Sequence, residues 1–197
     1  MFKPTTEPLD PAIFQRITSA YANKNVATYT QRLNSGSGRS QSLGILARRN
    51  YGVGESRNND SHKEILCAAK ELATIICPDL NWTTLAINKN YEAKPHRDKN
   101  NDGISCVVAF GDYTGGELEA DGALYDLRFK PLFFEASKIT HSVKPITSGE
   151  RFSIVFFRPN YPKRFVAKYG STLTYDEIYA LIPPRGDAAA SAVRVPY

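Results

Sequence analysis

The chain changes its residue pattern at Pro78, and this change limits the folds that it can adopt. Before Pro78, two stretches carry helical signals, residues 11–23 and 61–77. After it come seven short runs rich in β-branched and aromatic residues: WTTLAINK, ISCVVAFG, GGELEA, ALYDLRF, PLFFEA, KITHSV and RFSIVFFR. Two helices followed by seven strands predict an α+β domain whose β half is a jelly-roll sandwich or barrel.

Local signals mark where several of these elements begin or turn. Asp10 is the expected N-cap of the first helix and Pro11 its first residue. Ser61 and Glu64 have the spacing of a capping box for the second helix. The dipeptide 121–122, Asp-Gly, predicts a tight hairpin turn, and LTYDEIYALI (173–182) predicts a late helix.

The organisation that we expect is one domain over residues 1–182. It consists of a helical and basic flanking region (1–80) and a β core (81–160), followed by a flexible tail (183–197). No apolar run approaches the roughly 18 residues of a membrane span, so we expect no membrane association. The three cysteines form no C-x-x-C pair and predict buried free thiols in a reducing, intracellular compartment. The sequence pattern leaves the oligomeric state open.

The positive charge is concentrated in the first half of the chain. The net charge is +5: residues 1–101 carry 14 Lys and Arg against 9 Asp and Glu, and residues 102–197 carry 11 against 11. Much of the excess lies in the polar, Gly-rich stretch 31–60, which includes Arg39, Arg48, Arg49, Tyr51 and Arg57. Such a stretch is typical of a surface that binds a polyanion, but an ordinary solvated basic loop explains it equally well.

Candidate metal ligands are few because the chain has three histidines. His96 and Asp98 are two residues apart, so on an extended segment their side chains point the same way. His62 and Glu64 have the same spacing on a predicted helix, where they lie about 200° apart and cannot share one ion. By elimination His141 is the third ligand. Two histidines and a carboxylate are typical of non-haem Fe(II) oxygenases, although hydrolytic zinc can use the same set.

A candidate carboxylate anchor follows on the last predicted strand. Arg151 and Ser153 alternate onto one face of RFSIVFFR. A guanidinium there can bind a carboxylate through two hydrogen bonds, and the hydroxyl can add a third. A cation in an otherwise apolar strand therefore favours the oxygenase interpretation over zinc hydrolysis.

With these residues the sequence resembles the Fe(II)/2-oxoglutarate dioxygenase superfamily over residues 82–158. The resemblance implies a double-stranded β-helix (jelly-roll) core with N-terminal flanking helices. It implies that His96, Asp98 and His141 bind Fe(II), and that Arg151, assisted by Ser153, binds the distal carboxylate of 2-oxoglutarate. It also implies O2 as cosubstrate and ascorbate as a stimulant. Asn88 or Asn90, with Tyr91, looks like the cosubstrate-holding Asn-x-Tyr element of AlkB-like members.

Within that superfamily, HRDKNNDGISCVVAFGDYTGGELEADG looks most like the TET/JBP group of nucleic-acid 5-methylpyrimidine hydroxylases. The match implies hydroxylation of a methyl group on a base, with succinate and CO2 as coproducts, and DNA favoured over RNA as the partner. Asn101 matches the position that contacts the base, and Arg48, Arg49 and Arg57 would hold the strand from a lid over the site. No second base-reading histidine follows the R-x-S strand. Hydroxylation of a protein side chain or small molecule, or a non-catalytic metal-binding barrel, therefore stays open.

Overall fold

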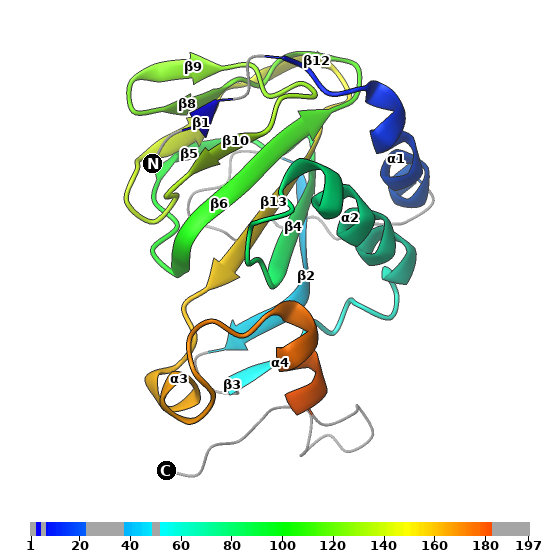
Figure 1. Cartoon of the computed structure of the whole chain (residues 1–197). Coiled ribbons are helices and arrows are strands. Elements are labelled where there is room, and N and C mark those ends of the chain that lie inside the picture. Colours follow the sequence, from blue (N-terminus) through cyan, green and yellow to red (C-terminus); the bar gives the residue numbers. More distant parts are fainter. Residues whose placement is uncertain (1–2, 5–6, 23–37, 49–51, 183–197) are drawn as a thin grey trace.

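The protein folds as two facing β-sheets with helices packed against one of them (Figure 1). The structure, a computed structural model, describes residues 3–4, 7–22, 38–48 and 52–182. Strand pairs within both sheets are antiparallel, as expected for a jelly roll. The predicted tail, 183–197, lies outside the described residues.

The larger sheet has seven strands in the order β1-β10-β6-β13-β4-β2-β3. Their bounds are β1 Lys3–Pro4, β10 Leu132–Phe134, β6 Asn101–Phe110, β13 Phe152–Pro159, β4 Thr84–Lys89, β2 Arg39–Arg48 and β3 Gly52–Glu55. The central strand β13 pairs with β4 on one side and β6 on the other. Because β2 and β3 belong to this sheet, it begins well before residue 81, the predicted start of the β core.

The smaller sheet has four strands in the order β5-β11-β8-β9, and a separate two-stranded pair joins β7 and β12. Their bounds are β5 Ala93–His96, β11 His141–Val143, β8 Leu118–Ala120, β9 Ala123–Tyr125, β7 Tyr113–Gly115 and β12 Ile146–Gly149. The turn between β8 and β9 has positive φ at both Asp121 (52°) and Gly122 (76°). This conformation confirms the predicted two-residue hairpin.

Alternation along β13 places the two faces of the larger sheet in different surroundings. Phe152, Ile154 and Phe156 belong to the apolar cluster under the helices. Val155, in between, packs into the cluster enclosed by the two sheets. The inner face is therefore where Arg151 and Ser153, which alternate with the helix-facing residues, can approach a ligand.

Two N-terminal helical segments cover the outer face of the larger sheet (Figure 1). A 3₁₀ turn, η1 Pro11–Phe14, continues into α1 Gln15–Ala22, and the Asp10 carboxylate accepts a hydrogen bond from the Ala12 amide as predicted. The longer helix α2 spans Lys63–Ile76 and buries six residues against the sheet: Ile65, Ala68, Ala69, Leu72, Ala73 and Ile76. The predicted flanking helices are confirmed.

The predicted capping box of α2 is wrong. The N-cap is His62, whose side chain makes no capping bond, and its carbonyl accepts from the Leu66 amide at 3.0 Å. The Ser61 hydroxyl instead donates to the Asn58 carbonyl at 3.1 Å, within the turn that precedes the helix. A serine engaged in this turn cannot also cap the helix, so α2 starts later than the pattern indicated.

Two short C-terminal helices, α3 Lys163–Tyr169 and α4 Tyr175–Leu181, pack on the β2–β3 end of the larger sheet (Figure 1). The late helix was predicted, and the Thr174 and Glu177 side chains cap it reciprocally. α3 was not predicted. In the described part of the chain no helix is long and apolar enough to cross a membrane. Cys77 and Cys106 are buried and Cys67 half-buried, all as free thiols.

We expect the apolar cluster under the helices to contribute much of the free energy of unfolding. Phe156 is fully buried on β13, with its ring centroid 5.0 Å from that of Trp82. Replacing Phe156 by Ala should lower the free energy of unfolding by about 3–5 kcal/mol, because the cavity cannot close around a central strand. Urea denaturation measures this change, with Ile75→Ala as control. Ile75 is 55% exposed on α2, and its replacement should change stability by less than about 0.5 kcal/mol.

Candidate metal centre

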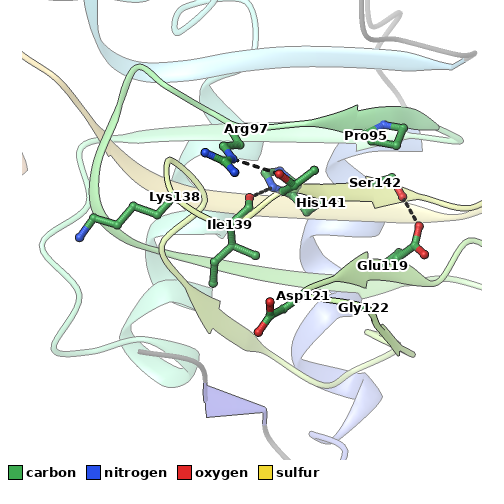
Figure 2. A pocket seen from close by; sticks show the side chains of 10 residues that line it. Pro95, Arg97, Glu119, Asp121, Gly122, Lys138, Ile139, His141 and Ser142 are labelled. Carbon is green, nitrogen blue, oxygen red and sulfur yellow. Dashed lines mark hydrogen bonds between the residues drawn. The ribbon is translucent and has the colours of Figure 1, made fainter.

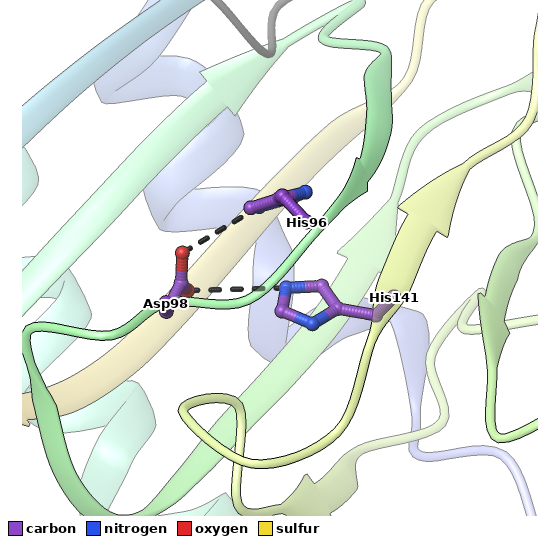
Figure 3. A group of neighbouring side chains, drawn as sticks. All are labelled: His96, Asp98 and His141. Atoms are coloured by element: carbon purple, nitrogen blue, oxygen red, sulfur yellow. Dashed lines mark ion pairs between the residues drawn. The ribbon is translucent and has the colours of Figure 1, made fainter.

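The three predicted metal ligands meet in space. Strand pairing places His141 directly opposite His96, since β11 and β5 are antiparallel neighbours in that register. Asp98 lies just beyond the end of β5, in the connection to β6. Figure 3 shows the three side chains converging, and one ligand atom from each lies within 4.8 Å of the others. In the described part of the chain this is the one such group of three.

The carboxylate of Asp98 lies between the two imidazoles. Its Oδ1 is 3.5 Å from His96 Nε2, and its Oδ2 is 3.9 Å from His141 Nε2. Both Nδ1 atoms face backbone carbonyls. His96 Nδ1 lies 2.8 Å from the Lys94 carbonyl oxygen, and His141 Nδ1 lies 3.0 Å from the Ile139 carbonyl oxygen. These bonds favour the tautomer with the proton on Nδ1, which leaves each Nε2 lone pair free for a metal.

The two imidazoles differ in their protonation equilibria. The hydrogen bond to Asp98 raises the pKa of His96 above its ordinary value, against an opposing effect of burial. Burial lowers the pKa of His141, which also packs edge-on against Phe134 with ring centroids 5.1 Å apart. The side chains are 19%, 37% and 8% exposed for His96, Asp98 and His141. The site is therefore anchored on the His141 side and reachable from solvent on the Asp98 side.

Arg151 lies inside the barrel, as its alternation on the strand predicted. It is 2% exposed, and its guanidinium carbon lies 5.7 Å from the centre of the Tyr113 ring. Burial lowers the pKa of Arg151, an effect that Tyr113 partly offsets. Its Nε is buried without a hydrogen-bond partner, and none of the ion pairs found between described residues involves it. A buried cation with an open donor fits a carboxylate ligand such as the distal end of 2-oxoglutarate.

The polar residues around Arg151 divide into two groups by position. Asn90, in a left-handed conformation (φ 48°), holds the Arg151 backbone through two hydrogen bonds. Its side-chain Oδ1 accepts from the backbone amide of Arg151 at 2.7 Å, and its backbone amide donates to the Arg151 carbonyl at 2.7 Å. Asn88 instead donates to the Ser153 hydroxyl at 3.2 Å, with both side chains buried. Between the two asparagines, Asn88 is therefore the one placed beside the predicted hydroxyl. Tyr91 is half-buried in the segment leading to β5.

Two neighbours of Arg151 were not singled out from the sequence. Tyr113 contacts both Arg151 and Arg128, whose guanidinium carbon is 4.3 Å from the ring centre. Gly116 (φ 71°) lies so close that an added Cβ would sit 2.7 Å from Arg151 Cδ and 3.0 Å from its Nε. The Gly-Gly pair that opens GGELEA was the available signal, since it leaves space for the arginine side chain.

Of the predicted substrate contacts, the structure describes Asn101, Arg48 and Arg57. Asn101 is buried at the start of β6, and its side-chain nitrogen Nδ2 lies 3.4 Å from Asp98 Oδ2. Arg39 and Arg48 begin and end β2, so this part of the basic stretch is sheet rather than a lid. Arg57 is exposed in the turn before α2, and Arg49 and Tyr51 lie outside the described residues. β2 is separated from β6 by β4 and β13, so contact between these arginines and a substrate stays a prediction.

A surface pocket of about 380 Å³ lies beside His141 (Figure 2). Arg97 and Lys138 supply positive charge to its lining, and Glu119 and Asp121 supply negative charge. Arg97, which lies between His96 and Asp98 in the sequence, donates from Nε to the Thr140 hydroxyl at 3.0 Å. This bond ties the segment that carries two of the metal ligands to the residue just before β11. Because the charges are mixed, this pocket does not by itself select one class of substrate.

Known structures share this fold. No protein-family model matches the chain, and neither does any curated protein sequence. NgTET1 in complex with 5mC DNA aligns with a TM-score of 0.57 at 16% identity, over 88% of this chain and 73% of that one. An oxidoreductase of the 2OG-Fe(II) oxygenase family from Burkholderia pseudomallei gives 0.57 at 16%, over 78% and 81%. A Pseudomonas putida prolyl-4-hydroxylase gives 0.48 at 17%, over 80% and 92%. The first two likenesses establish the fold of 2OG-Fe(II) oxygenases and confirm the predicted jelly roll.

Gly116 provides a test of the prediction that Arg151 binds a carboxylate. Gly116→Ala should weaken 2-oxoglutarate binding at least tenfold, about 1.4 kcal/mol, because the new methyl group displaces the Arg151 side chain. Calorimetric titration of the Mn(II)-loaded protein measures this affinity. Gly122→Ala is the matched control: its φ of 76° imposes similar backbone strain, but an added Cβ there meets nothing within 4 Å. Equal affinity in both variants would contradict the assigned role of Arg151.

The histidine environments predict how metal binding depends on pH. In the metal-free protein His96 should titrate above about 6.5 and His141 below it, and NMR of the imidazole protons can measure both. Since metal binding requires neutral imidazole, Mn(II) affinity should fall about tenfold per pH unit once the pH drops below the pKa of His96. A reversed order of the two pKa values, or an affinity independent of pH between 5 and 8, would contradict this assignment.

Proposed function

We propose that this protein is an Fe(II)/2-oxoglutarate-dependent dioxygenase that hydroxylates a methyl group on a nucleic-acid base. The observation that carries the chemistry is the pairing of two features in one fold. A His-Asp-His group has both Nε2 atoms facing the Asp98 carboxylate, and a buried guanidinium with an open donor lies between the two sheets. Two imidazoles and one carboxylate leave coordination positions open for a chelating cosubstrate and oxygen.

The chain's own residues would act by holding and positioning. His96, Asp98 and His141 would ligate Fe(II), and Arg151 with the Ser153 hydroxyl would bind the distal carboxylate of 2-oxoglutarate. When bound, Fe(II) and 2-oxoglutarate would, together with O2, supply the oxidation that converts a C–H bond to C–OH, with succinate and CO2 as coproducts. Asn90 would hold the Arg151 backbone in place and Gly116 would leave space for its side chain before the cosubstrate arrives.

The choice of a nucleic-acid base rests on two supports. NgTET1, seen in complex with 5mC DNA, shares the fold over 88% of this chain. The net charge of +5 also favours a polyanionic partner, and the exposed Arg97 adds positive charge beside the metal ligands. DNA is the favoured substrate on the first of these supports. Hydroxylation of a protein side chain or a small molecule is the alternative, since the same ligands serve any substrate that reaches the open side of the site.

Turnover on defined substrates tests the proposal. We expect the protein, with Fe(II), 2-oxoglutarate and ascorbate, to add one oxygen to 5-methylcytosine or thymine in DNA, detected by mass spectrometry of the digested nucleosides. RNA and N-methylated bases are assayed in parallel, together with succinate. His96→Ala and Asp98→Ala should reduce both signals to background because each removes a metal ligand. His62→Ala, which alters the other His-x-carboxylate pair, should keep activity.

The outcomes separate the alternatives. Succinate that forms without any changed nucleoside would retain the oxygenase and redirect the search to proteins and metabolites. A protein that binds Fe(II) but neither 2-oxoglutarate nor oxygen would instead be a metal-binding barrel without turnover.

A further inference from the structure

The carboxylate ligand is held differently from the two histidines. His96 and His141 both belong to strands of the smaller sheet, paired with each other. Asp98 lies in the four-residue connection 97–100, which leaves that sheet at His96 and enters the larger sheet at Asn101. A ligand on a connection depends on specific bonds for its orientation, because no strand ladder fixes its backbone on both sides.

Two backbone bonds fix the main chain of Asp98. Its amide donates to the Ala136 carbonyl at 2.9 Å, and its carbonyl accepts from the Asn101 amide at 2.8 Å. The carboxylate itself receives a donor from the same asparagine: Asn101 Nδ2 lies 3.4 Å from Asp98 Oδ2 and 3.5 Å from the Ser105 hydroxyl. The two N–H groups of one amide thus face the metal-ligating carboxylate and a residue of β6.

Asn101 is itself rigidly placed. The residue is 8% exposed, and its backbone pairs with Pro159 at the end of β13. Asn160 adds three bonds across this junction: its backbone amide donates to the Asn100 carbonyl at 2.7 Å, and its Nδ2 donates to the carbonyls of Lys99 at 3.4 Å and Asn101 at 3.5 Å. The amide of Asn101 is therefore carried by the larger sheet and aimed at the ligand that spans the two sheets.

We propose that Asn101 is a positioning residue that orients the Asp98 carboxylate for metal binding, rather than a contact to the substrate. The inference rests on the metal site of the proposed function but not on its substrate. An amide with both N–H groups engaged within the protein has no donor left for a base. A donor to one carboxylate oxygen leaves the other oxygen directed at the metal position, with the rotation of the carboxylate restricted.

Metal affinity in the absence of any substrate tests this role. The metal-free protein is titrated with Mn(II), and Asn101→Leu, which keeps the branching at Cγ, is compared with Asn101→Ala. Both variants should bind Mn(II) about 10–100-fold more weakly than the unaltered protein, the loss typical of removing a hydrogen bond to a metal ligand. Thermal melting of the metal-free variants checks that each is folded, and the result is read from whichever variant melts as the unaltered protein does.

Two control variants isolate the bond to Asp98. Ser105→Ala removes the other partner of the Asn101 amide and should leave Mn(II) affinity within about twofold. Asn100→Ala alters the exposed neighbour in the same connection and should do likewise. A Mn(II) affinity unchanged in folded Asn101 variants, with KM for nucleic acid raised, would overturn the proposal in favour of a base contact. An unaltered protein that binds Mn(II) but oxidises no nucleic acid would remove the proposed substrate and leave this inference standing.

Discussion

The guanidinium of Arg151 imposes the strictest requirement on this fold, because it is a cation enclosed between two sheets. Taking such a group out of water is costly unless hydrogen bonds or a counter-charge compensate it. The surrounding residues meet part of that cost: Asn90 fixes the backbone, the face of Tyr113 lies against the cation, and Gly116 leaves the space that a side chain would fill. The remaining open donor at Nε is the feature that would allow the interior to bind a carboxylate.

The metal site depends on strand register in the same strict way. His96 and His141 are 45 residues apart, yet they become direct neighbours because β5 and β11 pair in that register. A shift of one residue would turn one imidazole to the outer face of the smaller sheet. The Arg97 to Thr140 bond and the short strands on both sides of β11 oppose such a shift. Register is therefore a condition for metal binding as well as for packing.

The sequence predicted those features whose signals are local. The alternation of Arg151 and Ser153 in an apolar strand, the Asp-Gly turn at 121–122, and the scarcity of histidines were sufficient for the strands and the triad. Short strands such as β5, β7 and β12 have too few residues to show the two-residue alternation of apolar and polar side chains that identifies a strand. The capping box failed because a turn competed for Ser61, and residues 39–48 of the predicted lid lie in the larger sheet because β2 pairs with β4. Local pattern does not report either competition.

The connection between the sheets explains why the role of Asn101 could not be read from its spacing alone. An asparagine five residues after His96 could reach outward to a substrate or inward to the Asp98 carboxylate. The choice is made by distant residues: Pro159 and Asn160 pin the start of β6 to the end of β13, which buries the amide beside Asp98. The larger sheet thereby holds the carboxylate through Asn101 while the smaller sheet holds both imidazoles. The geometry of the three ligands consequently reflects how the two sheets are packed.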